Sequence, residues 1–236
     1  MLKRLANDVA EIKGRSRGAK ASETFGADRG EDILSIFPST GGEVVLIASS
    51  GRGKKLTRES LAELSSGRPV MKLEAKEQIV AAFEDLPGAE LVCVTSDAQV
   101  LRTGLDGIST QGPGAKGVTV MKLKGNAAVI GAGAAESSSL VFVTSDQGTH
   151  KVTELDEVPA KGQRTGGVRL TKFKGEQKLT YCWVGKPDQA ICIVGQPEAP
   201  TKAANKPESL TLRPTKRDAA MKETKHRVLA VGTMRW

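Results

Sequence analysis

The sequence predicts an all-β protein, a β-propeller of about five four-stranded blades of which the first is incomplete. Apolar runs of strand length recur every 47 to 50 residues, and each is followed by a polar turn. The composition agrees with this prediction, because the chain has 26 glycines and only 3% aromatic residues. Many short strands joined by glycine-containing turns are therefore favoured over a few long helices.

The first recurring feature is a predicted β-hairpin. It begins at Val44, Leu91 and Leu140, and in a weaker copy at Ala190. Each copy has an apolar run, a polar turn and then a short segment with basic residues, which is the pattern of a hairpin. The apolar residues occupy both faces of the predicted strands. This indicates sheets that are covered on both sides, as stacked blades are.

The second half of each unit recurs as well. Segments that begin at Gly67, Gly117 and Gly167 are 50 residues apart, and further apolar pairs follow at 79–80, 129–130, 179–180 and 228–229. Residues 2–4 resemble the second strand of a unit whose first strand would precede Met1. We therefore expect one domain over 1–236, with units near 1–43 (incomplete), 44–90, 91–139, 140–189 and 190–236. A β-sandwich that is repetitive by chance is the alternative, and the fixed order of the segments argues against it.

Charge and composition narrow the possible functions. A formal net charge of +8 favours a polyanionic partner. Three cysteines without a C-x-x-C spacing, together with two histidines, predict neither a disulfide framework nor a metal site. We expect no cofactor. The sequence has no apolar run of the ~20 residues that cross a bilayer and no signal peptide, so a cytoplasmic, nucleoid-associated protein is expected.

Residues for catalysis are missing from the sequence. The phosphate-binding motif G-x-x-x-x-G-K-[ST] does not occur, and two isolated histidines argue against a serine triad. The only tyrosine, Tyr181, has no arginine beside it and is interpreted as a residue of a blade. We therefore expect no enzymatic activity from this chain on its own.

Three glycine-rich segments resemble a known DNA-binding loop. They are KGRSRGAK (13–20), QGPGAKG (111–117) and QRTGGV (163–168). With the T-S-D-x-G turns, they resemble the loop Q-R-R-G-G-K-G and its eroded versions in the β-pinwheel of the A subunits of bacterial DNA gyrase and topoisomerase IV. The resemblance covers nearly the whole chain. Each of the three copies is incomplete, so a gyrase-like and a topoisomerase IV-like parent both stay open.

This resemblance implies an accessory domain of a type II DNA topoisomerase. Such a domain binds double-stranded DNA independently of sequence and wraps or bends it on a basic rim. The implied partners are the B subunit, which hydrolyses ATP, and the catalytic core of the A subunit. A propeller that binds proteins and not nucleic acid is the alternative, since the fold alone does not decide between them.

The candidate DNA-binding residues share one setting, a cation or glutamine near glycines at corresponding places of successive units. Glycine allows the backbone to approach a phosphate, and Lys or Arg neutralises it. The candidates are Arg15, Arg17, Lys20, Arg52, Lys54, Lys55, Arg58, Arg68, Arg102, Gln111, Lys116, Lys151, Lys161, Gln163, Arg164 and Arg169. Acidic residues cluster in other segments (28–32, 74–77 and 84–85), so we expect the two signs of charge to lie on different edges and to leave a basic rim.

Overall fold

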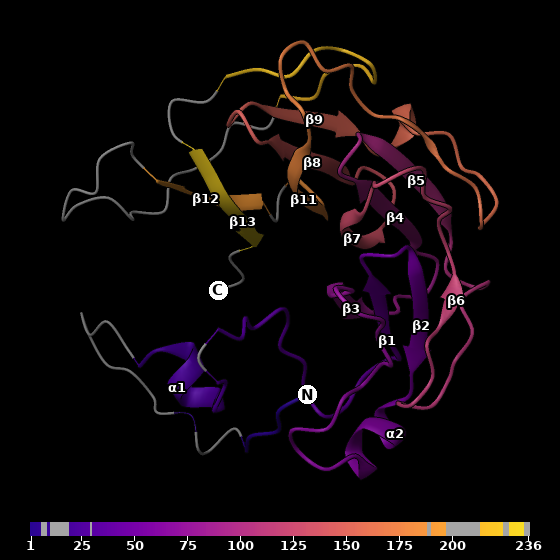
Figure 1. Cartoon of the computed structure of the whole chain (residues 1–236), viewed down its shortest axis with the longest axis vertical. Helices are drawn as coiled ribbons and strands as arrows, with labels where there is room; N and C mark the ends of the chain where they lie inside the picture. The colour runs from indigo at the N-terminus through magenta and orange to yellow at the C-terminus, as the bar shows by residue number, and fades with distance from the viewer. Residues whose placement is uncertain are drawn as a thin grey trace.

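A computed structural model of the chain describes residues 1–5, 9, 19–28, 30–187, 190–196, 213–223 and 227–233, with the backbone alone for 21, 190–196 and 227–233. Its strands form four sheets that follow one another along an arc in chain order (Figure 1). Two short α-helices, α1 (Ala21–Phe25) and α2 (Arg58–Glu63), and a 3-10 turn, η2 (Leu155–Glu157), complete the described elements. The predicted all-β fold is confirmed. No helix in this described part is long and apolar enough to cross a membrane.

The first sheet has the order β3-β1-β2-β6. Its strands are β1 (Val44–Ala48), β2 (Arg52–Leu56), β3 (Ile79–Glu84) and β6 (Val118–Thr119), all paired antiparallel. Every residue of β1 is buried. Val45 and Ile47 pack against the second sheet, whereas Val44, Leu46 and Ala48 belong to a separate core on the other face. The first sheet is thus covered on both faces, as the double-sided apolar pattern predicts.

The other sheets repeat this plan with fewer strands toward the C-terminus. The second has the order β10-β5-β4-β7, the third β11-β8-β9, and the fourth consists of β12 and β13. Their strands are β4 (Glu90–Thr95), β5 (Gln99–Gly104), β7 (Val129–Ala135), β8 (Leu140–Ser145), β9 (His150–Glu154), β10 (Val168–Arg169), β11 (Leu179–Gly185), β12 (Ala190–Gln196) and β13 (Arg227–Thr233). The strands predicted at Val44, Leu91, Leu140 and Ala190 are all present.

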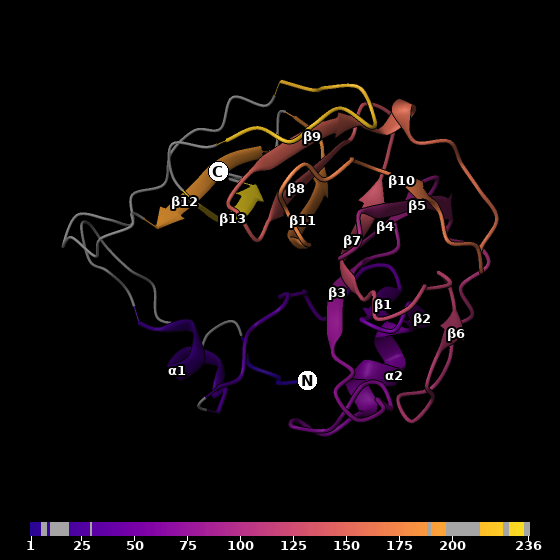
Figure 2. The same cartoon turned by 45° about the horizontal axis from the view of Figure 1, so that its top comes forward.

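In the first two sheets, the strand at the outer edge, β6 or β10, comes from the repeat that follows. Gly53 of β2 pairs with Val118 of β6, and Val100 of β5 pairs with Val168 of β10. In the third sheet, His150 of β9 forms a bridge with Lys222. The connections that lead to β6 and β10 run along the outer side of the arc (Figures 1 and 2). Blades and sequence repeats are therefore offset, and each blade is tied to the next.

Neighbouring sheets pack closely enough to require glycine. A side-chain carbon added to Gly131 of β7 would lie 2.9 Å from Cβ of Cys182, and one added to Gly133 would lie 3.0 Å from Cβ of Val184. This contact between β7 and β11 closes the core between the second and third sheets. Cys93 and Cys182 are free thiols. Burial raises the pKa of both, that of Cys182 to about 12, and both thiols pack among apolar residues between the sheets.

The strand predicted at residues 2–4 of the first unit is absent. The described part of 1–43 contains α1 and no strand. One pairing agrees with an incomplete blade: the amino group of Met1 donates to the carbonyl of Arg68 at 3.0 Å, and Gly67 N–H donates to the carbonyl of Met1 at 2.8 Å. Arg68 lies 50 positions before Val118, and Val118 pairs with Gly53 in the first sheet. Met1 therefore contacts Arg68 as Gly53 contacts Val118. Residues 2–4, predicted as the second strand of this unit, form no strand, and the described residues of the unit contain no central strand for them to pair with.

Candidate nucleic-acid interface

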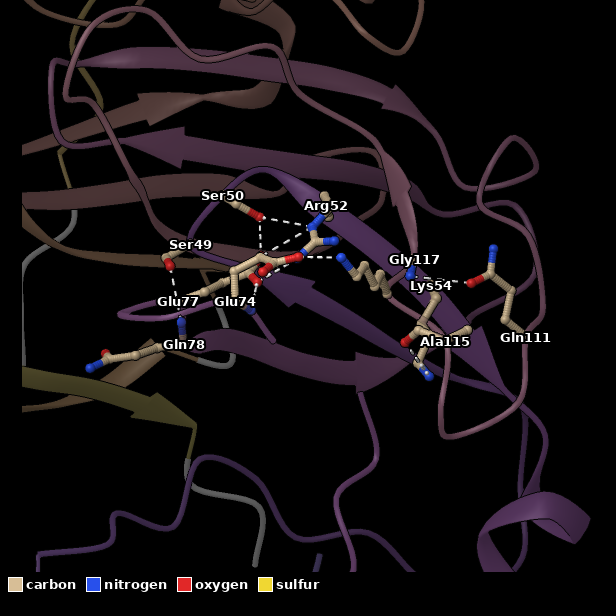
Figure 3. A network of polar contacts seen from close by, with 11 residues as sticks. Ser49, Ser50, Arg52, Lys54, Glu74, Glu77, Gln78, Gln111, Ala115 and Gly117 are labelled. Carbon is tan, nitrogen blue, oxygen red and sulfur yellow. Dashed lines mark hydrogen bonds and ion pairs between the residues drawn. The ribbon is translucent and has the colours of Figure 1, made fainter. Parts of the chain in front are cut away.

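The glycine-rich loop 111–117 lies on the outer connection just before β6. The side-chain oxygen of Gln111 accepts a hydrogen bond from Gly117 N–H at 3.2 Å, which joins the first and last residues of the loop (Figure 3). Gly117 has φ +80°, and an added Cβ would lie 2.6 Å from the carbonyl oxygen of Gly53. Only glycine fits there, because the backbone is left-handed and touches β2. Gly167 holds the corresponding place beside Val100 with φ +73°.

Lys54 supports the same loop from within the sheet. Its ammonium group donates to the carbonyl oxygens of Gly112 (2.7 Å), Pro113 (3.1 Å) and Ala115 (3.2 Å). The side chain is fully buried, and burial lowers its pKa to about 8. A phosphate cannot reach this ammonium without opening the loop. Lys54 therefore organises the loop instead of contacting DNA directly.

Lys151 has a comparable place in the third sheet. This buried side chain donates to the carbonyl oxygens of Lys216 (2.9 Å) and Ala219 (2.7 Å). Burial lowers its pKa to about 8 as well. Lys54 lies on β2 and Lys151 lies on β9. Each binds carbonyls of the chain segment just before the residues that pair with the outer edge of its sheet. The recurrence indicates a structural role for each.

The expected separation of charges is wrong in the first sheet. Acidic residues from the predicted separate edge form ion pairs there with four candidate cations. The pairs are Arg52–Glu77, Lys55–Asp85, Arg58–Glu84 and Lys116–Glu74. The reason is the sheet order, because β3 and the loop before it return to β1 and β2 and bring their carboxylates alongside. The cations of the first sheet are therefore largely neutralised by the protein.

The carboxylate of Glu77 shows how tightly these charges are held. Its side chain accepts from Ser50 and from the guanidinium of Arg52 (Figure 3). Burial by itself would raise the pKa of Glu77, but the hydrogen bonds from Arg52 and Ser50 outweigh it and lower the pKa. Glu74 accepts from Lys116, and this hydrogen bond lowers the pKa of the Glu74 carboxyl.

Several candidates of the other units are also engaged. Arg102 pairs with Glu90 at 2.7 Å and donates to two backbone carbonyls near η2. Arg169 pairs with Asp218 at 2.7 Å. Further contacts are Lys20 with Glu23 at 3.2 Å and the amide of Gln163 with the carbonyl of Gly104 at 3.1 Å. Arg15 and Arg17 lie outside the described residues.

Three candidates keep exposed cationic groups. Arg68, Lys161 and Arg164 are exposed, and none of them has an ion pair within the described residues. Arg164 N–H donates to the carbonyl of Val120 at 2.7 Å, which anchors the loop 162–166 on the neighbouring segment 120–124. The guanidinium of Arg164 is left available to a partner. The free candidates thus gather on the outer connections and not on the strands.

Sequence reasoning missed a series of lysines beside these loops. Lys72, Lys122 and Lys172, here called the lysine series, are exposed, have no ion pair among the described residues and are spaced 50 residues apart. Lys122 N–H donates to the carbonyl of Thr165 at 3.0 Å, beside the loop of Arg164, and Lys72 N–H donates to the carbonyl of Ala115 at 3.2 Å in the loop 111–117. The constant spacing was visible in the sequence and was the signal that could have identified them.

Comparison with known protein families identifies the family of this chain. The model of the DNA gyrase C-terminal domain, beta-propeller, matches residues 42–83, 89–136 and 139–182, which is more than half of the chain. The chain belongs to this family. This family is a C-terminal accessory domain and not the catalytic core, so the prediction of a domain without its own catalytic centre is confirmed.

Sequence relatives agree with the family. The chain is 27% identical over 158 residues to the DNA gyrase A subunit of Pseudomonas aeruginosa, covering 64% of this chain and 17% of that protein. It is 26% identical over 149 residues to the DNA gyrase A subunit of Mycobacterium tuberculosis, covering 61% of this chain and 18% of that protein. The chain therefore spans less than a fifth of the length of these relatives.

Solved structures share the fold. The C-terminal domain of DNA topoisomerase IV superposes with a TM-score of 0.78 at 19% identity, covering 95% of this chain and 73% of that one. The DNA gyrase A C-terminal domain gives a TM-score of 0.68 at 14% identity, covering 82% of this chain and 66% of that one. These similarities confirm the predicted pinwheel fold.

Proposed function

We propose that this domain binds double-stranded DNA independently of sequence and wraps or bends it along the outer connections of the sheets. One observation carries the proposal: exposed cations without protein partners among the described residues recur beside glycine loops on successive outer connections, as the lysine series, Lys161 and Arg164 do. Regularly placed cations can follow the phosphates of a duplex, and they need no contact with bases. The family membership of the chain supports this function.

The partners follow from the same family. We propose that the domain serves a type II topoisomerase, in which the catalytic core of the A subunit cleaves DNA and the B subunit hydrolyses ATP. The expected location is the nucleoid in the cytoplasm. If the domain neutralises about six phosphates, the logarithm of its affinity should fall against the logarithm of salt concentration with a slope of about −5.

Ligation of nicked circular DNA in the presence of the protein tests wrapping. A wrapped duplex is expected to give closed circles with a changed linking number, in proportion to the bound protein. The matched control is the double variant Lys122→Gln, Lys172→Gln, which keeps the fold and should shift the linking number less. An unchanged linking number together with binding would show docking or simple bending and would overturn wrapping.

A second candidate function is a protein contact. Ile33, Leu34 and Ile36 are exposed apolar residues in the first unit, and such residues favour contact with another protein surface. Binding that is insensitive to salt, with no retarded duplex in a mobility-shift titration, would favour this alternative over DNA binding.

A further inference from the structure

The segment 33–36 of the first unit lies where the inner strand of a sheet would lie. With Phe37 its sequence is I-L-S-I-F, and 46 residues later β3 begins I-V-A-A-F. The hydroxyl of Ser35 donates to the carbonyl of Ala82 at 2.7 Å, which holds the segment beside β3 (Figures 1 and 2). In the same way, β3 packs beside β7, the inner strand of the next sheet. The first unit therefore keeps the place that corresponds to β3.

Residues 1–3 lie where the second strand of a sheet would lie. The contact between Met1 and Arg68 aligns them with 53–55 of β2. In the first sheet, the central strand β1 pairs with β2 on one side and with β3 on the other. In the first unit both flanks are present, and no strand lies between them in the part of the chain that the structure describes. This place between 1–3 and 33–36 is here called the open strand position.

The pairing of β1 predicts the register of a strand in the open strand position. Leu46 of β1 pairs with Lys54 on one side and with Ala82 on the other. By the two alignments, Lys54 corresponds to Leu2 and Ala82 corresponds to Ile36. A strand that pairs as β1 does would therefore place its central residue between Leu2 and Ile36.

The flanks of the open strand position expose large apolar side chains. The exposed fractions are 40% for Leu2, 47% for Leu34 and 64% for Ile36, whereas every residue of β1 and its equivalents β4 and β8 except Glu90 is buried. The backbone N–H and carbonyl groups of these three leucine and isoleucine residues have no partner among the described residues. Unpaired backbone groups beside apolar side chains are a template for a further strand.

We propose that the open strand position binds an apolar β-strand of a partner polypeptide, which pairs antiparallel with 1–3 and with 33–36. The strands in this place of other units show what the partner needs, since they read V-V-L-I-A, L-V-C-V-T and L-V-F-V-T. The partner strand has about five uncharged, mostly β-branched or aliphatic residues. It contains no proline, because a central strand uses its N–H groups on both sides. This surface goes beyond the proposed function and does not depend on DNA binding.

A peptide titration of the ¹⁵N-labelled full chain tests the proposal. The probe is a synthetic peptide with the sequence of 43–49, E-V-V-L-I-A-S, with lysines added at both ends for solubility. Saturable shifts are expected for the amides of Leu2, Leu34 and Ile36. A peptide with proline in place of the central leucine should not bind, because proline has no N–H to donate. No saturable shift with the first peptide, or equal shifts with both peptides, would overturn the proposal.

Two variants locate the peptide on the chain. Ile36→Asp should weaken peptide binding by about tenfold or more, because strand pairing would bury an unpaired charge. Leu86→Asp is the matched control, since Leu86 is a similarly exposed apolar residue outside the open strand position. It should leave peptide binding unchanged. Both positions are exposed, so both variants should give the spectrum of a folded protein. Equal loss of binding in the two variants would contradict the assigned place.

Two further measurements separate this proposal from other outcomes. Sedimentation of the chain without peptide shows whether a second copy fills the position. Dimers that Ile36→Asp abolishes would overturn the assignment to a separate partner strand. A mobility-shift titration with a 20-base-pair duplex tests the proposed function independently. If the peptide binds and the duplex does not, the open strand position stands and the proposed function is wrong, whereas the opposite result rejects the strand and keeps the function.

Discussion

The ammonium nitrogen of Lys54 lies 2.7 Å from the carbonyl oxygen of Gly112, so a buried charge on β2 holds the outer loop of its own sheet. Burial lowers the pKa of this lysine from 10.5 to about 8. Between these two values the unfolded chain binds the proton and the folded chain does not. The contribution of Lys54 to the free energy of unfolding therefore rises with pH across that window.

DNA binding should depend on pH in the opposite direction. The ammonium of Lys54 holds the loop that carries Lys116, so affinity for duplex DNA should fall as this lysine loses its proton when the pH rises through about 8. Lys54→Arg should remove this component because arginine stays charged, whereas Lys151→Arg should leave it in place. Fluorescence anisotropy at constant ionic strength measures both. Identical pH profiles for Lys54→Arg and the unaltered chain would contradict the assignment.

Glu74 is expected to weaken DNA binding. It pairs with Lys116, and the positions 50 and 100 residues later hold Lys124 and Lys174. Glu74→Gln should free Lys116, raise DNA affinity several-fold and make the salt slope steeper by about 1.

The control for this change is Glu63→Gln, which alters the net charge equally at an exposed acidic residue of α2 without an ion pair among the described residues. An equal gain in both variants would mean that net charge alone matters. A titration of affinity against salt concentration distinguishes the two outcomes.

The lysine series should account for separate phosphate contacts. Lys122→Gln and Lys172→Gln should each reduce the steepness of the salt dependence by about 0.9, since each removes one phosphate neutralisation. Lys186→Gln is the control, because Lys186 already pairs with Glu136 at 2.5 Å. Filter binding over a range of salt concentrations gives the slopes. Unchanged slopes for both series variants would remove these lysines from the interface.

Two glycines of one loop should respond differently to alanine. At Gly117 the added carbon would meet the carbonyl of Gly53 at 2.6 Å in a left-handed backbone, so Gly117→Ala should lower the free energy of unfolding by about 1–3 kcal/mol. At Gly114 an added carbon meets nothing within 4 Å. Gly114→Ala should leave stability unchanged and weaken DNA binding by hindering the approach of a phosphate. Urea denaturation and anisotropy test the pair, and a stable Gly117→Ala protein would refute the first half.

Much of the fold was predictable because its signals are local and repeated. The strands at Val44, Leu91 and Leu140 follow from apolar runs and polar turns that lie within a few residues of each other. The glycines at 117 and 167 were visible as members of a 50-residue series, and the structure shows that both have positive φ. The roles of Lys54 and Lys151 were not predictable, since an exposed lysine and a buried one look alike in a sequence.

The sequence by itself determined the repeat, the strand positions and the resemblance to the gyrase pinwheel, because period and pattern are properties of neighbouring residues. Only the tertiary structure decided which cations are available. The partners Lys116 and Glu74 are 42 residues apart, and Lys54 meets its loop across 58 residues. Such contacts depend on how sheets and outer connections lie against one another. Which cations are exposed is therefore a property of the folded chain, in which carboxylates or carbonyls hold most of the described candidate cations and a smaller set has no such partner among the described residues.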